Sequence, residues 1–436
     1  MSVIGIINSD EQLQEKLQKQ LAVEDLSHDT ISLLGNNDEV MEYLNFDIPE
    51  LVIINLSDSN LAITNIIGQI AADNWLHNFG IIGIYDKKTT SEKTLSEQLK
   101  KTNLLNLIDY TKIAANLLKT IRIIKANSQI IFQKEISSTL VEKLSGSFEL
   151  DNDLLSVPCY TNLLCIALFN KGYIDAEMKI NLNIALSELL INAIEHGNCK
   201  ISYAEKQEFI KQGRTIHELI EERCRDPEIA KKKVILEYDI QHDHSVFKIK
   251  DEGEGFNVQK YHEWIQKKDP FSLHGRGIMM ARSLASRLTY NAKGNEATLY
   301  IEHKEVPFAS PIGFATEQPI VFQKGDIVFR EGEESNHIYY VISGRYSVFH
   351  KNKNIGYITP ADIFMGEMSF LLNNRRSATV RAEKEGKLIK ISKKTFISVI
   401  KRYPHYGVFL SRLIARKLAR TNTQTARMMI KLSQYA

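Results

Sequence analysis

The segment Ser187–Asn198, SELLINAIEHGN, constrains the fold of this chain more than any other stretch. At helical spacing, Glu188, Asn192 and His196 fall four residues apart and share one face. Apolar side chains around the same turns provide a core-facing side: Ile184, Leu189, Ile191 and Ile194. A carboxylate beside a carboxamide suits chemistry on a magnesium-bound phosphate, because the amide oxygen can bind Mg²⁺ and the carboxylate can take a proton from a hydroxyl. The alternative is an ordinary helix whose polar face is solvated.

Two glycine-rich stretches follow this segment. Asp251–Phe256, DEGEGF, comes directly after the alternating run Val246–Lys250, which is typical of a strand. His274–Ile278, HGRGI, opens a second apolar-periodic segment, Met279–Leu288. Glycines at a strand end let the backbone approach a ligand, and glycines before a helix present N–H groups to phosphate. Both stretches are therefore candidate ligand-binding loops.

The three stretches occur in the order E-x-x-x-N-A-x-x-H, D-x-G-x-G-F and G-x-G. In this order they resemble the Bergerat-fold ATPases, which include gyrase-like, histidine-kinase-like and anti-sigma-kinase-like domains. The resemblance covers about Phe148 to His303 and is closest to the anti-sigma-factor serine kinases. No histidine lies between His77 and His196, so no phosphoaccepting histidine precedes the domain. The short lid, Asn257–Leu273, favours the same branch.

This resemblance implies a role for each motif residue. Asn192 would coordinate Mg²⁺ of the bound ATP, and Glu188 would act as the base toward a serine hydroxyl on a partner protein. Asp251 would accept a hydrogen bond from the adenine amino group. The expected glycine-turn and phosphate-bordering residues are Gly253, Gly255, Gly275, Arg276 and Gly277. His196 is expected to be structural, and the charged helical excursion 201–233 departs from the compact anti-sigma kinases.

Residues 1–125 show short apolar runs that alternate with helical patterns. The runs Val3–Ile7, Leu51–Asn55 and Gly80–Tyr85 predict a parallel, doubly wound α/β sheet. The pattern resembles a response-regulator receiver domain. A plain flavodoxin-like scaffold is the alternative.

The receiver chemistry is missing from this pattern. Asn8 and Ser9 stand where receivers place an acidic pair, and Asn55 stands at the phosphoacceptor position. Asp10 is the only acid nearby, and no lysine is evident around Leu107–Tyr110. We therefore expect a pseudo-receiver that docks or dimerises and is not phosphorylated.

A polar–apolar connector, residues 126–147, is expected to be helical, and a proline-punctuated linker spans 306–317. Residues 318–436 then change to short strands and glycine turns, which predict a small jelly-roll-like β-barrel followed by helices. Within it, Gly366–Val380, GEMSFLLNNRRSATV, resembles the phosphate-binding cassette of cyclic-nucleotide-binding domains. The approach to this cassette is one residue longer than usual.

The cassette implies a second ligand site. Glu367, after Gly366, would bind the ribose 2′-hydroxyl, and Arg376 would neutralise the cyclic phosphate with help from Ser377 and the Ala378 N–H. The ligand is cAMP or cGMP, since Ser377 occurs in readers of both. The alternative is a degenerate barrel that keeps the glycines without the ligand.

Composition sets further limits. A chain of 436 residues is expected to hold about three domains. Its four cysteines form no C-x-x-C pair, which favours reduced thiols. No apolar run reaches membrane-spanning length and the N-terminus lacks a basic segment, so a cytoplasmic protein is expected. Residues 401–436 carry eight Lys and Arg and no acid. These residues are interpreted as a solvated face or a moving lid, with nucleic acid or membrane binding as the alternative.

Together these patterns predict a multidomain signalling protein. Its units are a pseudo-receiver (1–125), the connector (126–147), a histidine-kinase-like α+β ATPase sandwich (148–305), the linker (306–317) and a cyclic-nucleotide-binding domain (318–436). The expected activity is ATP-dependent serine phosphorylation of a small antagonist-type protein, with a sigma factor as a further candidate partner. The alternative is a non-catalytic module, switched by both nucleotides, that sequesters a partner. A homodimer is expected, without direct contact to membrane or DNA.

Overall fold

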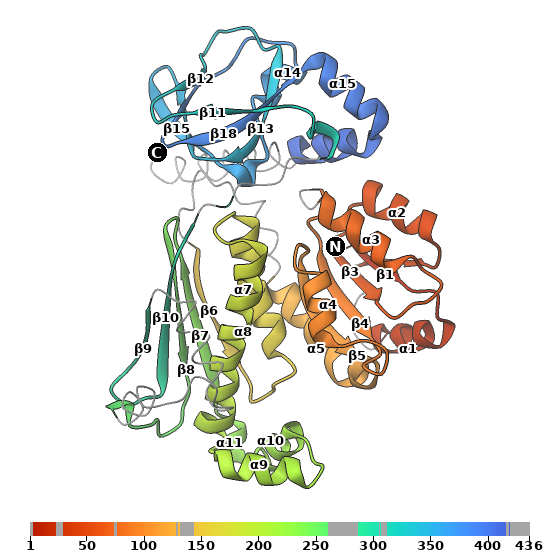
Figure 1. Cartoon of the computed structure of the whole chain (residues 1–436), viewed down its shortest axis with the longest axis vertical. Coiled ribbons are helices and arrows are strands. Elements are labelled where there is room, and N and C mark those ends of the chain that lie inside the picture. The colour runs from red at the N-terminus through yellow and green to blue at the C-terminus, as the bar shows by residue number, and fades with distance from the viewer. Residues whose placement is uncertain are drawn as a thin grey trace, which may run out of the picture.

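The computed structural model describes residues 3–22, 29–73, 76–127, 130, 144–259, 287–304, 306, 312–415 and 418. These residues form an N-terminal, a central and a C-terminal domain (Figure 1). The expected phosphate-bordering triplet Gly275, Arg276 and Gly277, and the expected lid beyond residue 259, lie outside the described residues. Within the described ranges, no helix is both long and apolar enough to cross a bilayer.

The N-terminal domain is built on a parallel five-stranded sheet of order β2-β1-β3-β4-β5. This is the flavodoxin-like doubly wound order. Strands β3 and β4 are buried along their whole length, as expected of parallel strands with both faces covered. The elements are β1 (Val3–Ile7), α1 (Glu11–Leu21), β2 (Thr30–Leu34), α2 (Asn37–Phe46), β3 (Leu51–Asn55), α3 (Ile63–Ala72), β4 (Gly80–Tyr85), α4 (Glu92–Gln98), β5 (Leu104–Asp109), η1 (Tyr110–Lys112) and α5 (Ile113–Ala126).

The central domain packs two long helices against one face of an antiparallel five-stranded sheet of order β6-β7-β8-β10-β9 (Figure 1). Its strands alternate buried and exposed residues, which is the pattern of a sheet with one covered face. The elements are β6 (Leu144–Leu150), α7 (Val157–Asn170), α8 (Ala176–Asn192), η3 (Ala193–Asn198), α9 (Tyr203–Lys211), α10 (Ile216–Arg223), α11 (Pro227–Ala230), β7 (Val234–Ile240), β8 (His244–Lys250), β9 (Arg287–Tyr290) and β10 (Glu296–Glu302).

Two sequence expectations need correction here. The connector was expected to be helical through residue 147, but strand β6 begins at Leu144 because residues 144–150 pair with all seven residues of β7. Most of the rest of the connector lies outside the described residues. The long helix was expected to continue to His196, but α8 ends at Asn192 and the chain continues as a π-helical segment.

The C-terminal domain is a sandwich of two four-stranded sheets, β11-β18-β13-β16 and β12-β17-β14-β15. Its elements are β11 (Pro319–Phe322), β12 (Ile327–Phe329), β13 (His337–Ser343), β14 (Tyr346–His350), β15 (Lys353–Ile358), η5 (Pro360–Asp362), β16 (Phe364–Met365), α14 (Glu367–Leu371), β17 (Thr379–Ala382), β18 (Gly386–Ser392) and α15 (Lys393–Arg402). Residues 404–415 continue as a further helix. The preceding short helix η4 (Ile312–Phe314) lies in the expected linker, yet Phe314 is buried in this domain's core beside Tyr406.

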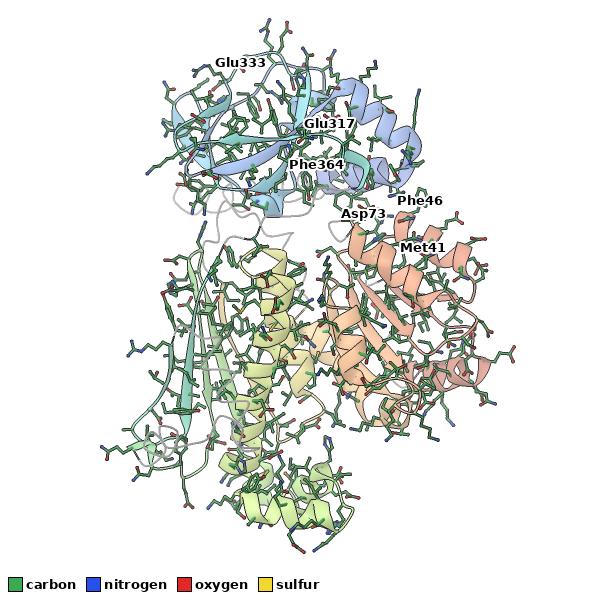
Figure 2. All side chains as sticks on the ribbon, in the orientation of Figure 1. Met41, Phe46, Asp73, Glu317, Glu333 and Phe364 are labelled. Carbon is green, nitrogen blue, oxygen red and sulfur yellow. The ribbon has the colours of Figure 1, made fainter. Side chains whose placement is uncertain are left out.

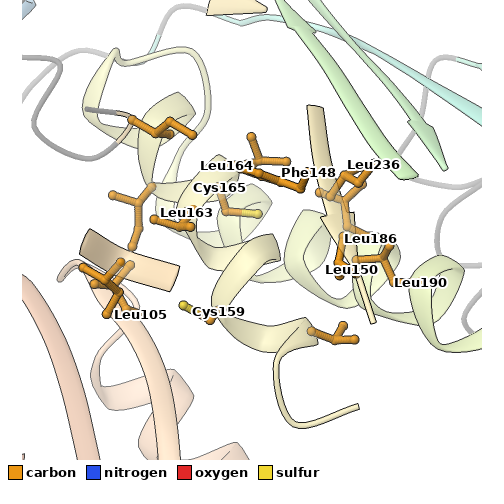
Figure 3. Packing of buried hydrophobic residues seen from close by; sticks show 14 of the residues in the cluster. Leu105, Phe148, Leu150, Cys159, Leu163, Leu164, Cys165, Leu186, Leu190 and Leu236 are labelled. Atoms are coloured by element: carbon orange, nitrogen blue, oxygen red, sulfur yellow. The ribbon is translucent and has the colours of Figure 1, made fainter. Parts of the chain in front are cut away.

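One apolar core runs from the N-terminal domain into the central domain. Leu105 of β5 belongs to the same buried cluster as Cys159 and Leu163 of α7, and the cluster continues to Phe148 and Leu236 of the central sheet (Figure 3). Strand β5 is the edge of its sheet, so α7 covers an edge that would otherwise expose unpaired backbone groups. All four cysteines are free thiols, as expected.

Candidate nucleotide-binding sites

Helix α8 carries the two residues expected to work on ATP. The helix begins at an N-cap, Asp175, whose side chain accepts a hydrogen bond from Met178 N at 2.7 Å. Glu188 and Asn192 lie one turn apart near its other end, and both are partly exposed. Within the described residues neither side chain makes a hydrogen bond, so both remain available to a ligand.

The electrostatic surroundings of Glu188 suit a proton acceptor. Burial raises the pKa of its carboxyl, and the nearby carboxylate of Glu195 raises it further, while Lys206 opposes both effects. A carboxylate of higher pKa is a stronger base toward a hydroxyl group than a fully solvated one. The position and pKa of Glu188 therefore fit the role of a general base.

The segment after α8 is a π-helical turn, Ala193–Asn198. Two contacts to Ile201 hold this turn: Ile201 N donates to Glu195 O at 2.8 Å, and Nδ1 of His196 lies 2.6 Å from Ile201 O. Such turns are rare and frequent at functional sites. The wider turn moves His196 off the regular α-helical spacing, and its ring binds the backbone, which agrees with the structural role expected for it.

Sequence reasoning overlooked Glu195, which lies inside the motif. Its side chain is only 2% exposed and pairs with Lys206 of α9, with 2.6 Å between Oε2 and Nζ. Helix α9 belongs to the charged excursion, 201–233, which the sequence left without a role. The excursion therefore supplies a charge beside the candidate ATP site, and only the three-dimensional contact reveals the pair.

The Asp251 loop packs directly on the π turn. A Cβ at Gly197 would lie 2.4 Å from Cγ of Asp251, and a Cβ at Gly253 would lie 2.4 Å from the Gly197 carbonyl oxygen. Burial raises the pKa of Asp251, and the bond that Oδ1 accepts from Gly253 N at 2.8 Å opposes this. Two glycines thus leave a close cradle around one buried carboxylate, which fits the expected adenine contact.

Asparagines hold this cradle in place. Asn295 Nδ2 donates to Asp251 O at 2.7 Å, and Asp251 N donates to Asn295 O at 3.0 Å. On the other side, Glu252 N donates to Oδ1 of the fully buried Asn198 at 2.9 Å. At Gly255 the backbone has φ +79°, and a Cβ would lie 2.0 Å from the carbonyl oxygen of Lys293. The expected turn at Gly255 is therefore present.

The residues expected to hold Mg²⁺ form no cage. In the described part of the chain, no three His, Cys, Asp or Glu side chains converge as a metal site. A single carboxamide oxygen, that of Asn192, fits Mg²⁺ that keeps several waters and is bound mainly through substrate phosphates. Asn192 would then hold the ion, whose charge would offset that of the phosphates.

The second candidate site surrounds Arg376, whose side chain is 4% exposed. Nη1 donates to Gly366 O at 3.0 Å and to Ser369 Oγ at 3.2 Å, while Nη2 donates to His337 O. The guanidinium also lies 4.3 Å from the ring centroid of Phe329. Its Nε is buried without a hydrogen-bond partner among the described residues, so this donor is left for an anion.

The remaining cassette residues lie around this guanidinium. Glu367 is buried at the start of α14, and burial lowers the pKa of Arg376 while Glu367 opposes that effect. Gly366 has φ +78°, and a Cβ there would lie 2.3 Å from Arg376 Nη1. Ser377 is exposed and Ala378 is partly exposed. The cassette therefore brings its acidic and basic residues together around one unpaired donor, which fits a cyclic phosphate.

The polar residues after β1 and β3 of the N-terminal domain bond to one another. The Tyr110 hydroxyl donates to Asn55 Oδ1 at 2.6 Å, and Asn55 Nδ2 donates to Asn8 Oδ1 at 2.8 Å. Ser9 Oγ donates to Asp58 Oδ1 at 2.7 Å. Asn55 thus bonds within a network of amides and hydroxyls, and the structure adds Asp58 to Asp10, which was expected to be the only acid nearby.

Comparison with known proteins identifies two domains in this chain. The histidine kinase-like ATPase domain family matches residues 166–301, and the cyclic nucleotide-binding domain family matches residues 319–403. The chain contains both domains. The two matches bracket Glu188 and Asp251 in the ATPase domain and Arg376 in the cyclic-nucleotide-binding domain, which we call the sensor.

Individual relatives match only short parts of the chain. It is 35% identical over 78 residues to the cAMP-dependent protein kinase type II regulatory subunit of Drosophila melanogaster, covering 18% of this chain and 20% of that protein. It is 29% identical over 114 residues to a CRP-like cAMP-activated global transcriptional regulator of Mycobacterium tuberculosis, covering 25% of this chain and 50% of that protein. Among solved structures, the catabolite activator protein of Thermus thermophilus is 23% identical, covering 27% and 57%, with a TM-score of 0.26. The chain thus spans half or less of these curated relatives.

Proposed function

We propose that this chain is an ATP-dependent serine protein kinase of the anti-sigma-factor type that is regulated by a cyclic nucleotide. The observation that carries the proposal is the half-buried carboxylate of Glu188, one helical turn from Asn192. A domain that only bound ATP would need Asn192 and Asp251 but no base at position 188. The raised pKa of Glu188 is the property that proton transfer from a serine hydroxyl requires.

In this proposal each site residue has one role in binding ATP or in transferring its phosphate. Asp251 holds the adenine amino group, and the glycines at 197 and 253 let the π turn and the loop pack closely around its carboxylate. Asn192 holds Mg²⁺, which neutralises phosphate charge when ATP is bound. Glu188 accepts the proton of the attacking serine hydroxyl while that oxygen forms a bond to the γ-phosphorus and ADP leaves. The acceptor is a small antagonist-type protein.

The test uses the purified chain, γ-labelled ATP and Mg²⁺ in a lysate of the source cells, with and without cAMP or cGMP. Acid-stable label on the serine of a second protein is expected with the wild type and not with Glu188→Gln. A matched Glu177→Gln variant changes an exposed carboxylate in the first turn of the same helix instead and should keep transfer. Equal labelling by wild type and Glu188→Gln would refute the role of Glu188.

A second candidate is a non-catalytic module that sequesters a partner in an ATP-dependent manner. The observation that favours it is an apolar surface on α9, where Tyr203 is 43% and Ile210 is 47% exposed, beside the end of the ATP-binding helix. Exposed apolar side chains of this kind are common at protein contacts. ATP binding without any labelled serine, together with loss of partner binding in Ile210→Glu, would favour this candidate over the kinase.

A further inference from the structure

The helix that follows the sensor's sandwich is bonded to the N-terminal domain. The hydroxyl of Tyr406 lies 2.9 Å and 3.1 Å from the two carboxylate oxygens of Asp73, at the end of α3. Both residues are buried, and Gly313 N donates to the same hydroxyl at 3.3 Å. In Figure 2 Asp73 lies at the edge of its domain that faces the sensor's helices. A buried, charge-assisted bond of this kind fixes the two domains in one arrangement.

Apolar contacts extend this interface. Leu76 of the N-terminal domain is fully buried in the sensor's own core cluster, next to Phe314 and Tyr406. Phe46 meets His405 edge-to-face, with ring centroids 6.2 Å apart. The N-terminal domain therefore holds the sensor's helices through a continuous buried surface.

A second surface of the N-terminal domain, just before β5, holds the ATP-binding helix. Lys179 of α8 is buried, and its Nζ donates to Thr102 O, just before β5, at 2.7 Å. Asn162 of α7 donates to Leu105 O at 3.1 Å and accepts from Asn183 of α8 at 2.8 Å. Lys179 and Asn183 lie on the same helix as Glu188 and Asn192, so the contact reaches the catalytic helix itself.

Among the described residues, the sensor and the ATPase domain also touch directly. Nζ of Lys384, before β18, lies 3.1 Å from Nε2 of His242, between β7 and β8. His242 is on the turn of the central sheet, whereas the N-terminal domain reaches α8. The two contacts therefore offer two distinguishable routes between the nucleotide sites.

We propose that the N-terminal domain transmits cyclic-nucleotide binding to the ATP site, through Tyr406–Asp73 on one side and Thr102–Lys179 on the other. The proposal rests on the proposed function, because it requires that both nucleotides bind. A cyclic nucleotide that favours one position of the sensor's helices also favours one position of the N-terminal domain, and that domain holds α8. The fold without receiver chemistry thus serves as a rigid connection between two sites.

The experiment measures coupling in the full chain. Isothermal titration gives the affinity of the chain for the imido analogue of ATP in the presence of Mg²⁺. The titration is done first without cyclic nucleotide and then with saturating cAMP or cGMP. The ratio of the two affinities is the coupling factor, and the reverse titration must give the same factor by linkage. The wild type is expected to show a factor of at least 5 with one of the two cyclic nucleotides.

Three variants separate the routes. Tyr406→Phe removes one hydroxyl at the interface between the sensor and the N-terminal domain. Lys179→Met removes one amine at the interface between the N-terminal domain and α8. Each should bring the coupling factor to within twofold of one while ATP still binds. Lys384→Ala removes the direct contact and should leave the factor at its wild-type value. Because the first two changes lie on different domains, a folding defect in one of them leaves the other as a test.

The outcomes that overturn the proposal are specific. Loss of coupling in Lys384→Ala, with wild-type coupling in Tyr406→Phe and Lys179→Met, would assign the signal to the direct contact. Binding of both ligands to the wild type without any coupling would overturn the transmission alone. Absence of ATP binding to the wild type would overturn the proposed function as well, so the two failures are distinguishable.

Discussion

Nη1 of Arg376 occupies the space that a side chain at Gly366 would fill. The two residues are ten positions apart, Nη1 donates to Gly366 O at 3.0 Å, and a Cβ at position 366 would lie 2.3 Å from it. The left-handed backbone at Gly366, φ +78°, aims this carbonyl at the guanidinium. The cassette is therefore a preformed cradle that holds Arg376 with its Nε left for a ligand.

Replacing this guanidinium should abolish most cyclic-nucleotide binding. A lysine at 376 is a point charge that cannot bind Gly366 O, Ser369 Oγ and a phosphate at once, so Arg376→Lys should weaken cAMP or cGMP binding at least tenfold. Arg375→Lys is the matched control, because Arg375 is exposed and bonds only to Gly332 O among the described contacts. Calorimetric titration measures the affinity of each variant for cAMP and cGMP. Equal affinities of the two variants would contradict the assignment of Arg376 to the cyclic phosphate.

The buried pair of Glu195 and Lys206 makes a different prediction. Lys206→Met leaves the Glu195 carboxylate buried without its partner, which should cost about 2 kcal/mol of local stability, less than a fully buried pair because Lys206 is 26% exposed. Amide hydrogen exchange of residues 193–206 measures this loss of local stability without unfolding the other domains. Adding Glu195→Gln should restore most of the protection, since it removes the unpaired charge.

The control for this pair is a surface ion pair. Lys231 and Glu228 lie 2.6 Å apart with side chains 66% and 75% exposed. Lys231→Met should change protection by less than about 0.5 kcal/mol, because solvent screens exposed pairs. A similar loss in both lysine variants would show that the burial of Glu195 has no special effect.

Much of the N-terminal domain could be predicted from sequence, because its central strands are continuous apolar runs. The runs 51–55 and 80–85 coincide with β3 and β4, since both faces of a parallel sheet are covered. Strand β6 was partly missed because Ser145, Gly146 and Ser147 are exposed and polar, and only pairing with β7 makes them a strand.

The candidate sites were predictable as motifs but not as arrangements. Glu188 and Asp251 stand out by spacing, whereas the π turn that brings Gly197 against Asp251 depends on backbone bonds to residues beyond the helix. The contact between Tyr406 and Asp73 joins residues 333 positions apart. No periodicity shows which domain surface covers which, so the interfaces required the structure.

Glycine at 253 should be necessary for ATP binding. A Cβ there would lie 2.4 Å from the Gly197 carbonyl oxygen, which is backbone and cannot move aside, so Gly253→Ala should reduce affinity for the imido analogue of ATP at least tenfold. Gly68→Ala is the control, because Gly68 lies in helix α3 without a left-handed φ and has no described atom within 4 Å of its Cβ position. If Gly253→Ala bound the analogue like the wild type, the cradle around Asp251 would not be the adenine site.

The chain should lose stability in mild acid through His77. Burial lowers the pKa of His77 to about 4, its Nδ1 is buried without a hydrogen-bond partner among the described residues, and Nε2 lies 3.0 Å from Asn45 Oδ1. The folded pKa lies below the unfolded value of 6.5, so the unfolded state takes up the proton first. The contribution of His77 to the free energy of unfolding is therefore complete above pH 6.5 and falls as the pH drops toward 4, by up to about 3 kcal/mol.

His303, with a pKa also lowered to about 4, should destabilise the ATPase domain in acid independently of His77. Calorimetric melting at pH 7 and pH 5 should show a smaller acid shift in His77→Gln and in His303→Gln, and a still smaller one in the double variant. An unchanged acid shift in the double variant would mean that other groups cause the acid sensitivity.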